Sequence, residues 1–358
     1  MKILYCIACD IALTGTPVFV RDVISAFPQN NCAVYTPYKE VRKVYSESTC
    51  VYTGNIAPGG GTQYFEVAKD LKRVFSKTTR YDVVHINTAN IHLAYEYIKF
   101  FKKTGAKIIC HSHNVIHYRN NYIYNQLISY KRKYIIDNSD LLLACSKDAG
   151  LSMFGTDANF HVLKNYIDSK RFAYNMLWRN EIRKDINCQI LLGHIGAFNG
   201  QKNQKFLIEL MGKLDDRFHL LLVGDGEKKE QCISYCKELV LENRISFHSS
   251  CQEIEKYYSA FDIFLLPSFH EGMPLVLLEA QASHLNQIVS EYVPNNSVFD
   301  CYYLPLDTQL WRDKILELAQ MLNDRYDNSE SIVRSGYDKE TAIIPLVKFY
   351  SELLDDKE

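Results

Sequence analysis

The sequence has no long apolar run, and this absence limits how the protein could contact a membrane. No stretch of the 358 residues approaches the ~20 apolar residues that a membrane-spanning helix needs. Met1–Ile7 is too short for the apolar part of a signal peptide and has the pattern of a strand. The sequence therefore predicts a cytoplasmic protein, with any membrane association peripheral and on the inner face.

An excess of charge of either sign is also missing. Lys and Arg together number 41, Asp and Glu number 42, and the formal net charge is −1. A chain without a strong positive charge has no general electrostatic affinity for nucleic acid. We therefore expect no nucleic-acid partner.

Patterns typical of disulfide, zinc and dinucleotide proteins are absent. The 11 cysteines are scattered and odd in number, which argues against a disulfide framework. No Cys/His cluster has the spacing of a zinc site, so we expect no zinc, and no motif in the sequence indicates a cofactor. Cys6 and Cys9 have the spacing of a redox motif, but they span a strand end instead of opening a helix. The full G-x-G-x-x-G motif is missing, which counts against an NAD enzyme.

Two successive series of alternating strands and helices account for most of the chain. The length suits two domains of the usual ~100–200 residues, and alternation of this kind predicts α/β domains with doubly wound parallel sheets. In each half, a strand, a glycine-bearing loop and a helix open the series. The predicted central strands are Lys2–Ala8, Val83–Asn87, Lys107–Cys110, Asp140–Ser146, Gln189–His194, Phe218–Val223, Ile245–His248 and Ile263–Leu266.

Pro267–Ala282, with the sequence PSFHEGMPLVLLEAQA, carries most of the chemical information. Pro274 fits the first position of a helix, where a missing N–H does no harm. The free N–H groups of a helix start and the helix dipole favour a phosphate there. Glu271 and Glu279 flank this point. As carboxylates they repel a phosphate but accept hydrogen bonds from the hydroxyls of a sugar or a ribose.

This stretch resembles the E-x7-E motif of the family-4 retaining glycosyltransferases, with its core EG-x-PL-x-x-x-E. The resemblance implies that Glu271 is a catalytic residue that holds the donor sugar and that Glu279 holds the nucleotide ribose. It also implies that the chain between them contacts the sugar and phosphate of the donor. These donor-binding positions are Gly272, Met273, Pro274 and Leu275.

The polar cluster His111-Ser112-His113-Asn114 follows the strand Lys107–Cys110. Open α/β sheets place their sites at the carboxyl ends of strands. The cluster is similar to the point where bacterial exopolysaccharide members of the family carry a histidine beside the transferred sugar, which makes His113 the second expected catalytic residue. A histidine satisfied by backbone groups is the structural alternative.

The loop Gly196–Asn203 resembles the family's G-R-x-x-x-x-K loop, in which an Arg and a Lys clamp the donor diphosphate. Gly196 and Lys202 match, whereas Ala197 replaces the Arg and removes a bidentate phosphate partner. His194 or an Arg of the first domain is the alternative second cation. Gly15 is a weaker match to a glycine-rich loop that faces the donor phosphates or the acceptor, and a simple loop glycine is the alternative.

From Tyr97 to Ile136 the sequence has no Asp or Glu, and tyrosines and phenylalanines lie among its cations. Such a stretch suits an anionic membrane surface or a lipid diphosphate. A solvated face above core tyrosines is the alternative. The cations are Lys99, Lys102, Lys103, Lys107, Arg119, Lys131, Arg132 and Lys133.

The resemblance extends over nearly the whole chain and implies a GT-B fold, in which two Rossmann-like domains face a cleft. Residues 1–170 would hold the acceptor and residues 171–358 the nucleotide sugar. The final helix, residues 341–355, would pack back on the first domain. Within the second domain, His284-Leu285-Asn286 stands where relatives often have Gly-Leu-Pro, which we expect to alter a turn.

The implied reaction is a retaining, metal-independent hexosyl transfer. The donor would be a nucleotide sugar, with UDP favoured, and the acceptor a saccharide or a lipid-diphosphate-linked saccharide in cell-surface polysaccharide synthesis. Ala197 favours one alternative, a catalytically silent GT-B subunit that binds a nucleotide or a partner. An epimerase on the same fold is a further alternative, but it needs acid/base carboxylates that we cannot place.

Overall fold

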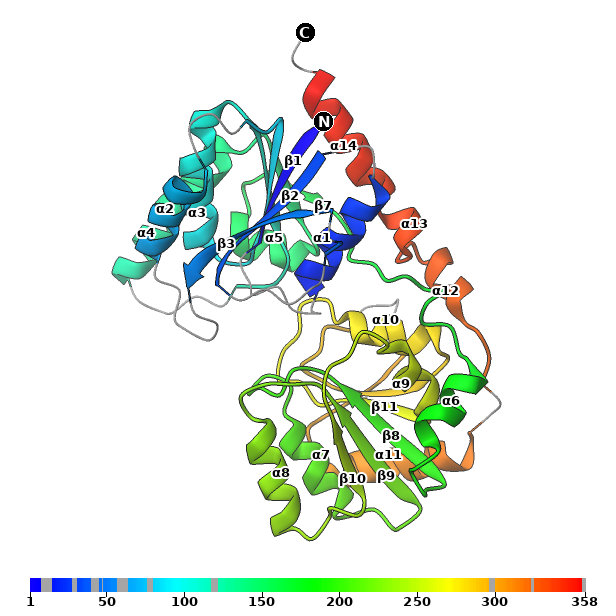
Figure 1. Cartoon of the computed structure of the whole chain (residues 1–358). Helices are drawn as coiled ribbons and strands as arrows, with labels where there is room; N and C mark the ends of the chain where they lie inside the picture. Colours follow the sequence, from blue (N-terminus) through cyan, green and yellow to red (C-terminus); the bar gives the residue numbers. More distant parts are fainter. Residues whose placement is uncertain are drawn as a thin grey trace. The chain divides into compact units, whose positions relative to one another are not determined.

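A computed structural model gives the fold of the chain (Figure 1). It describes residues 1–7, 15–27, 31–39, 45–46, 48–56, 64–75, 80–116, 122–295, 300–322 and 325–355. The chain forms two compact units. Unit 1 consists of Met1–Asn165 and Ala342–Glu358, and unit 2 consists of Tyr166–Thr341.

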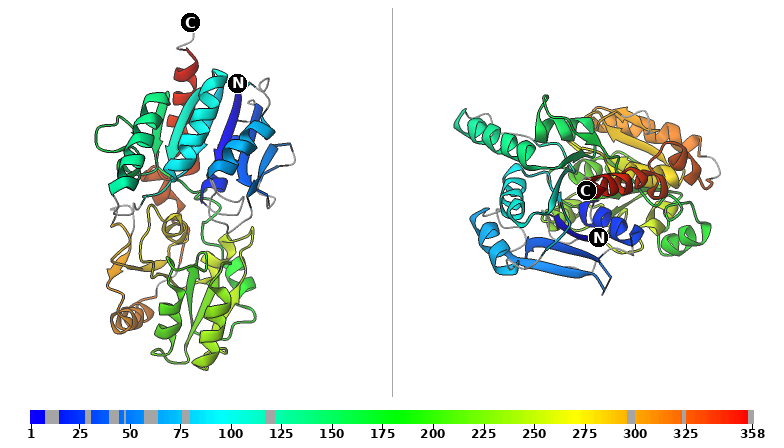
Figure 2. Two further views of the ribbon diagram at one scale, coloured as in Figure 1. Left: turned by 90° about the vertical axis from the view of Figure 1, so that its left-hand side faces the viewer. Right: turned by 90° about the horizontal axis from the view of Figure 1, so that it is seen from above.

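Unit 1 contains a seven-stranded parallel sheet with the strand order β3-β2-β1-β4-β5-β6-β7. Figure 2 shows the ribbon in two further views. Its strands are β1 Lys2–Ile7, β2 Asn31–Tyr38, β3 Cys50–Ile56, β4 Val83–Asn87, β5 Lys107–Ser112, β6 Leu141–Ala144 and β7 His161–Val162. Its helices are α1 Gly15–Ala26, α2 Tyr64–Val74, α3 Ile91–Phe101, the 3-10 turn Lys102–Thr104, α4 Tyr122–Asn138, α5 Lys147–Phe154 and α14 Ile344–Asp355.

Unit 2 contains a six-stranded parallel sheet with the strand order β10-β9-β8-β11-β12-β13. Its strands are β8 Ile190–Ile195, β9 Phe218–Val223, β10 Ile245–His248, β11 Ile263–Leu266, β12 Asn286–Ser290 and β13 Tyr302–Leu304. Its helices are α6 Met176–Arg183, α7 Gln204–Met211, α8 Lys229–Glu238, α9 Glu255–Ala260, α10 Leu275–Ala282, α11 Thr308–Gln320 and α12 Ser329–Arg334, and α13 Lys339–Ala342 leads back to unit 1.

Helices cover both faces of the unit 1 sheet, so its central strands are buried on both sides (Figure 1). On β4, Val84 and Ile86 join the core cluster that includes side chains of α2, α3 and α4. His85, between them, points to the opposite face, where its Nδ1 lies 2.7 Å from the Tyr350 hydroxyl of α14. Alternating side chains of one strand thus hold helices on the two faces.

In both sheets the strand order reverses beside the first strand, between β1 and β4 and between β8 and β11. The connections leave the sheet in opposite directions at such a point, and open α/β sheets bind ligands there, outside the carboxyl ends of the strands. Asn87 ends β4 and His113 directly follows β5 in unit 1. The β8–α7 and β11–α10 loops follow the corresponding strands of unit 2.

Several boundaries differ from those predicted. Helix α1 begins at Gly15, not at Val18, so Gly15 lies in its first turn; the rest of the predicted loop, residues 10–14, lies outside the described residues. The expected helix 341–355 is divided into α13 and α14. Pro345 explains the division, because it has no N–H for the carbonyl four residues earlier and its ring clashes with that carbonyl.

A short backbone bridge lies close to the point where the chain passes from unit 1 to unit 2. Ile167 pairs with Asp338, and the Asp338 carboxylate accepts hydrogen bonds from the backbone N–H and the hydroxyl of Ser169 at 3.1 and 2.6 Å. These contacts attach the segment after Asn165 to unit 2. The division between the units therefore falls a few residues before the expected position, 170/171.

Two helices of unit 2 end in left-handed turns without glycine. His284 after α10 has φ 53°, and Leu285 N–H donates to Ala280 O at 3.0 Å. Val240 after α8 has φ 56°, with Leu241 N–H donating to Cys236 O at 3.1 Å. Glycine is the usual residue at this position of a helix end. His284 thus has a backbone conformation that is strained for any residue other than glycine.

Candidate active site

The loop from β11 to α10 holds the predicted donor-binding residues. Pro274 precedes the helix, since its ψ of 99° is extended and α10 begins at Leu275. The expectation that Pro274 is the first helical residue is thus wrong by one position. No side chain caps this helix end. Leu277 N–H donates to Pro274 O at 3.0 Å, which leaves the N–H groups of Leu275 and Val276 available as donors. Gly272 and Met273 lie between these donors and Glu271.

Lys202 and Glu271 form an ion pair with Nζ and Oε1 2.7 Å apart, and their side chains are only 16% and 8% exposed. Gln201 lies beside them, with its Nε2 donating to His270 O at 2.8 Å and to Glu271 Oε2 at 3.3 Å. The backbone adds a hydrogen bond of 2.9 Å from Phe269 N–H to Gln201 O. The β8–α7 and β11–α10 loops therefore form one structure that brings two predicted site residues together.

Glu279 lies on α10 with one carboxylate oxygen used and one unused. Its Oε2 accepts a hydrogen bond of 2.5 Å from the Tyr258 hydroxyl, whereas Oε1 has no partner among the described residues. Burial raises the pKa of this carboxyl to about 7, against the opposing effects of the Tyr258 hydrogen bond and the nearby cations Arg171 and Lys202. When ionised, Glu279 can accept a further hydrogen bond from a ligand hydroxyl.

His194 does not replace the missing arginine. Its Nδ1 lies 2.8 Å from Leu265 O and its Nε2 lies 3.3 Å from Gln204 Nε2, so both ring nitrogens have partners. Burial lowers the pKa of His194 to about 4, which keeps the ring neutral near pH 7. The alternative that His194 supplies the second cation is therefore wrong. Ala197 itself is exposed.

Glycines let the β8–α7 loop pass close to its neighbours. A Cβ added at Gly196 would lie 3.2 Å from His194 Nε2 and 3.3 Å from Lys202 Cδ. Gly224, after β9, has φ 150°, and a Cβ there would lie 2.1 Å from Gly196 O. Gly196 thus leaves room for the Lys202 side chain, and Gly224 leaves room for the backbone of Gly196.

In unit 1, His113 lies among aromatic rings and one amide. Its Nε2 is 2.8 Å from Asn87 Oδ1, and its ring centroid is 5.0 Å from that of Phe19 and 4.0 Å from that of His111. Burial lowers the pKa of His113 to about 3. The alternative that backbone groups satisfy this histidine is wrong, because its recorded partner is a side chain. Phe19 belongs to α1, the helix that begins at Gly15, the weaker of the expected site residues.

Sequence reasoning missed the side chains that hold these groups in place. Asn87 could have been found, because it ends a predicted strand next to the one that leads to His113. Tyr258 and Gln201 gave no signal, since a tyrosine on a helix and a glutamine in a loop have many common roles. Tyr258 contacts Glu279 across 21 residues of sequence and Gln201 contacts Glu271 across 70.

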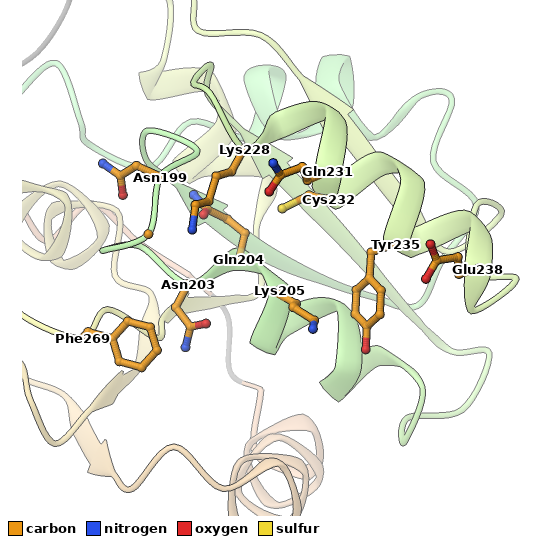
Figure 3. A pocket seen from close by; sticks show the side chains of 11 residues that line it. Asn199, Asn203, Gln204, Lys205, Lys228, Gln231, Cys232, Tyr235, Glu238 and Phe269 are labelled. Atoms are coloured by element: carbon orange, nitrogen blue, oxygen red, sulfur yellow. The ribbon is translucent and has the colours of Figure 1, made fainter. Parts of the chain in front are cut away.

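A hollow of about 370 Å³ lies between the β8–α7 loop, α7 and α8 (Figure 3). Amide side chains, the exposed Phe269 and the ammonium groups of Lys205 and Lys228 line it. Lys228 makes no ion pair with any described residue. None of the predicted donor-binding residues lines this hollow, so it is separate from the Lys202–Glu271 pair.

Among the described residues, no group of three or more His, Cys, Asp or Glu side chains is placed to hold a metal ion. None of the helices found in the described ranges has both the length and the apolar content to cross a membrane.

Two family models and several known proteins are similar to this chain. The model described as Glycosyltransferase Family 4 matches residues 14–171, and the model described as Glycosyl transferases group 1 matches residues 179–334. EpsF of Bacillus subtilis, named as a glycosyltransferase, is 25% identical over 342 residues, which cover 86% of this chain and 87% of EpsF. The UDP-Gal:alpha-D-GlcNAc-diphosphoundecaprenol alpha-1,3-galactosyltransferase of Escherichia coli is 26% identical over 215 residues, 55% of each chain.

The crystal structure of HepE from Anabaena in complex with UDP and glucose has a TM-score of 0.76 to this structure. The two are 15% identical, and the alignment covers 98% of this chain and all of HepE. This likeness and the two parallel-sheet units confirm the predicted GT-B fold. With a glycosyltransferase model matched in each half, the chain belongs to the glycosyltransferases that the family 4 and group 1 models describe.

Proposed function

We propose that the protein is a retaining, metal-independent hexosyltransferase of bacterial cell-surface polysaccharide synthesis. The donor would be a UDP-sugar, and the acceptor a saccharide or a lipid-diphosphate-linked saccharide. Relatives named for polysaccharide synthesis and for a diphosphoundecaprenol acceptor support this proposal, as does a structural neighbour with bound UDP and glucose. The observation that carries it is the Lys202–Glu271 pair beside the uncapped start of α10.

The donor would bind to unit 2. The unused Oε1 of Glu279 would accept a hydrogen bond from a ribose hydroxyl. Lys202 and the N–H groups of Leu275 and Val276 at the start of α10 would bind the diphosphate, and Glu271 would bind the sugar. As the sugar leaves, negative charge grows on the phosphate, and donors fixed in a site with little water stabilise such charge strongly. We propose that the leaving phosphate takes the acceptor's proton on the same face, so that no protein nucleophile is needed.

Unit 1 would hold the acceptor and contact an anionic membrane surface. Part of the basic stretch is engaged within the protein, since Lys107 pairs with Asp140 and Lys133 with Asp137. Three exposed lysines lie at the end of α3. Lys99 is in its last turn, and Lys102 and Lys103 follow it directly. On α4, Leu127 and Tyr130 are 44% and 59% exposed. Exposed cations with apolar side chains nearby suit the interface of an anionic bilayer.

A silent nucleotide-binding subunit is the second candidate. The neutral His194 and the exposed Ala197 favour it, because the β8–α7 loop then offers a single cation for a diphosphate. A screen of UDP-sugars decides between the candidates, with calorimetry for affinity and with donor hydrolysis and transfer for turnover. Binding with turnover supports the transferase, and binding without turnover supports the subunit. A protein that binds no UDP or UDP-sugar would refute both.

A further inference from the structure

The hollow between the β8–α7 loop, α7 and α8 has the size of a small-molecule site. Its volume of about 370 Å³ lies within the ~300–1,000 Å³ that is typical of ligand pockets. One wall is the bare backbone of Gly200, where an added Cβ would lie 3.3 Å from Lys228 Nζ. Lys228 N–H donates to Phe198 O at 3.0 Å, which attaches the start of α8 to the loop. Gly200 thus leaves room for an ammonium group beside the loop.

Two amide side chains that line the hollow are each oriented by a backbone carbonyl. Gln204 Nε2 donates to Ala197 O at 2.9 Å, and Asn203 Nδ2 donates to Pro267 O at 3.3 Å. A carbonyl oxygen only accepts, so the nitrogen of each amide must face it. Gln204 is only 1% exposed, yet neither its Oε1 nor Asn203 Oδ1 has a partner among the described residues. The hollow therefore offers two fixed acceptors for hydroxyl groups.

A donor and an aromatic ring lie in the same hollow. Asn199 Oδ1 accepts a hydrogen bond of 3.0 Å from Lys202 N–H, and its Nδ2 makes no hydrogen bond within the described ranges. Phe269, from the β11–α10 loop, is 49% exposed and lies at the same end of the hollow as Asn203 (Figure 3). A sugar ring has both hydroxyl groups and an apolar C–H face. Amide groups beside an exposed aromatic ring suit both.

The charge that a ligand meets in the hollow is positive. The charged residues that line it are Lys205, Lys228 and Glu238. Lys205 is engaged within the protein, since its Nζ lies 3.8 Å from Glu209 Oε1 and 4.5 Å from the centre of the Tyr235 ring. Glu238 lies at the far end, beyond Tyr235 (Figure 3). Lys228, which pairs with no described carboxylate, is therefore the cation open to an anionic group.

We propose that this hollow binds an acidic sugar, a pyranose that carries a carboxylate or a phosphate. Its hydroxyl groups donate to the two amide oxygens, its apolar face lies on Phe269, and its anionic group pairs with Lys228. Inorganic phosphate alone fits poorly, because the amide oxygens need a donor, and an apolar ligand would leave them unpaired. The site goes beyond the proposed function, since none of the predicted donor-binding residues lines it.

NMR titration of the full chain with four compounds tests the class of ligand. Glucuronate, glucose 6-phosphate, glucose and inorganic phosphate are compared in the presence of excess UDP, which occupies the proposed donor site. At least one acidic sugar should bind about tenfold more tightly than glucose, the factor for one hydrogen bond to a charged group, and the preferred one identifies carboxylate or phosphate. Glucose 6-phosphate should also bind more tightly than inorganic phosphate.

Three variants place the binding in the hollow. Lys228→Gln should lower the affinity for the preferred acidic sugar about tenfold and leave that for glucose unchanged. Lys237→Gln is the matched control, because it removes an exposed cation from the same helix but does not line the hollow. It should change neither affinity. Phe269→Ser should weaken binding of glucose and of the acidic sugar alike, since both lose the aromatic surface.

The result for UDP separates this proposal from the proposed function. UDP affinity should be the same in the three variants and in the wild type. A wild type that binds no UDP refutes the proposed function, and the titrations without UDP still test the hollow. The proposal is overturned if neither acidic sugar binds more tightly than glucose, if inorganic phosphate matches glucose 6-phosphate, or if Lys228→Gln keeps the wild-type affinities.

Discussion

Lys202 and Glu271 pair with each other at 2.7 Å, although they are the two groups proposed to bind opposite ends of the donor's scissile bond. Most of both side chains is buried, so the loss of one leaves the other as a nearly buried, unpaired charge. The bound donor would have to keep this pair or take over its charges. Variants of either residue therefore affect both stability and chemistry, and a useful experiment must separate the two.

Glu271→Gln should reduce sugar transfer at least ~100-fold, in the range for a lost transition-state contact, while UDP affinity changes little. It should also lower the free energy of unfolding by about 1–3 kcal/mol, because Lys202 loses its partner. Denaturant unfolding and steady-state kinetics measure the two effects.

Lys202→Gln combined with Glu271→Gln removes both charges and provides the control. Its stability should recover toward that of the wild type, while transfer stays low. Recovery of activity in this double variant would show that the carboxylate of Glu271 has no direct role.

Glu279 should make donor affinity depend on pH. Burial raises the pKa of its carboxyl to about 7 from a usual 4.5, so folding loses stability from this group as pH rises between these values. Ribose hydroxyls donate to the ionised form, so affinity for UDP-glucose should increase as pH rises through about 7. Calorimetry at several pH values measures this change.

Glu279→Gln removes the titration and should flatten that pH dependence. At high pH it should weaken binding by about 1.5–3 kcal/mol, the range for hydrogen bonds to charged groups. An affinity that stays independent of pH in the wild type would contradict the ribose assignment.

Ala197→Arg should strengthen donor binding by about 1.5–3 kcal/mol, since a guanidinium can bind a diphosphate with two hydrogen bonds. Ala197 is exposed and the neighbouring His194 is neutral, so the new cation meets no competing charge in that histidine. Calorimetry and transfer assays should be run together. An active wild type whose affinity the variant does not improve would show that Lys202 is not the only cation that binds the diphosphate.

Val240→Gly should stabilise the protein by about 1 kcal/mol, because a β-branched residue at φ 56° is strained and glycine is not. Gly336, which ends α12 with φ 73° and a similar pair of backbone hydrogen bonds, provides the matched control. Gly336→Ala should destabilise by a similar amount. Thermal unfolding measures both changes as shifts of Tm. Shifts in the same direction would refute this account of the helix ends.

The protein should bind anionic vesicles in co-sedimentation, and binding should weaken at high salt. Charge-removing variants of Lys102 and Lys103 together with Tyr130→Ser should reduce it. Lys237→Gln on α8 serves as the control, because it removes an exposed cation from unit 2. Equal binding to neutral and anionic vesicles would exclude an electrostatic contribution.

Much of the fold could be predicted because buried parallel strands appear in a sequence as short apolar runs between glycine-bearing loops. Val83–Asn87 and Ile263–Leu266 were predicted with the bounds that β4 and β11 have. The bounds of the last helix were predicted less accurately. The prediction followed the apolar pattern through Pro345 and did not allow for the break in the helix.

The site was predictable only in part. The spacing of Glu271 and Glu279 on either side of a helix start can be read from one segment of sequence. Their partners cannot, because Tyr258 comes from another helix and Lys202 from a loop 69 residues away. The pKa of Glu279 depends on those neighbours and on burial, so it too required the structure.

The division of unit 1 between the two ends of the chain affects the order of folding during synthesis. The Tyr350 hydroxyl contacts His85, and its ring lies 5.8 Å from that of Phe27, so the core of unit 1 includes residues from the last helix. Domains usually fold in the order in which the ribosome makes them. Here unit 2, Tyr166–Thr341, emerges before α14, so unit 1 gains its contacts with α14 only after unit 2 has been synthesised.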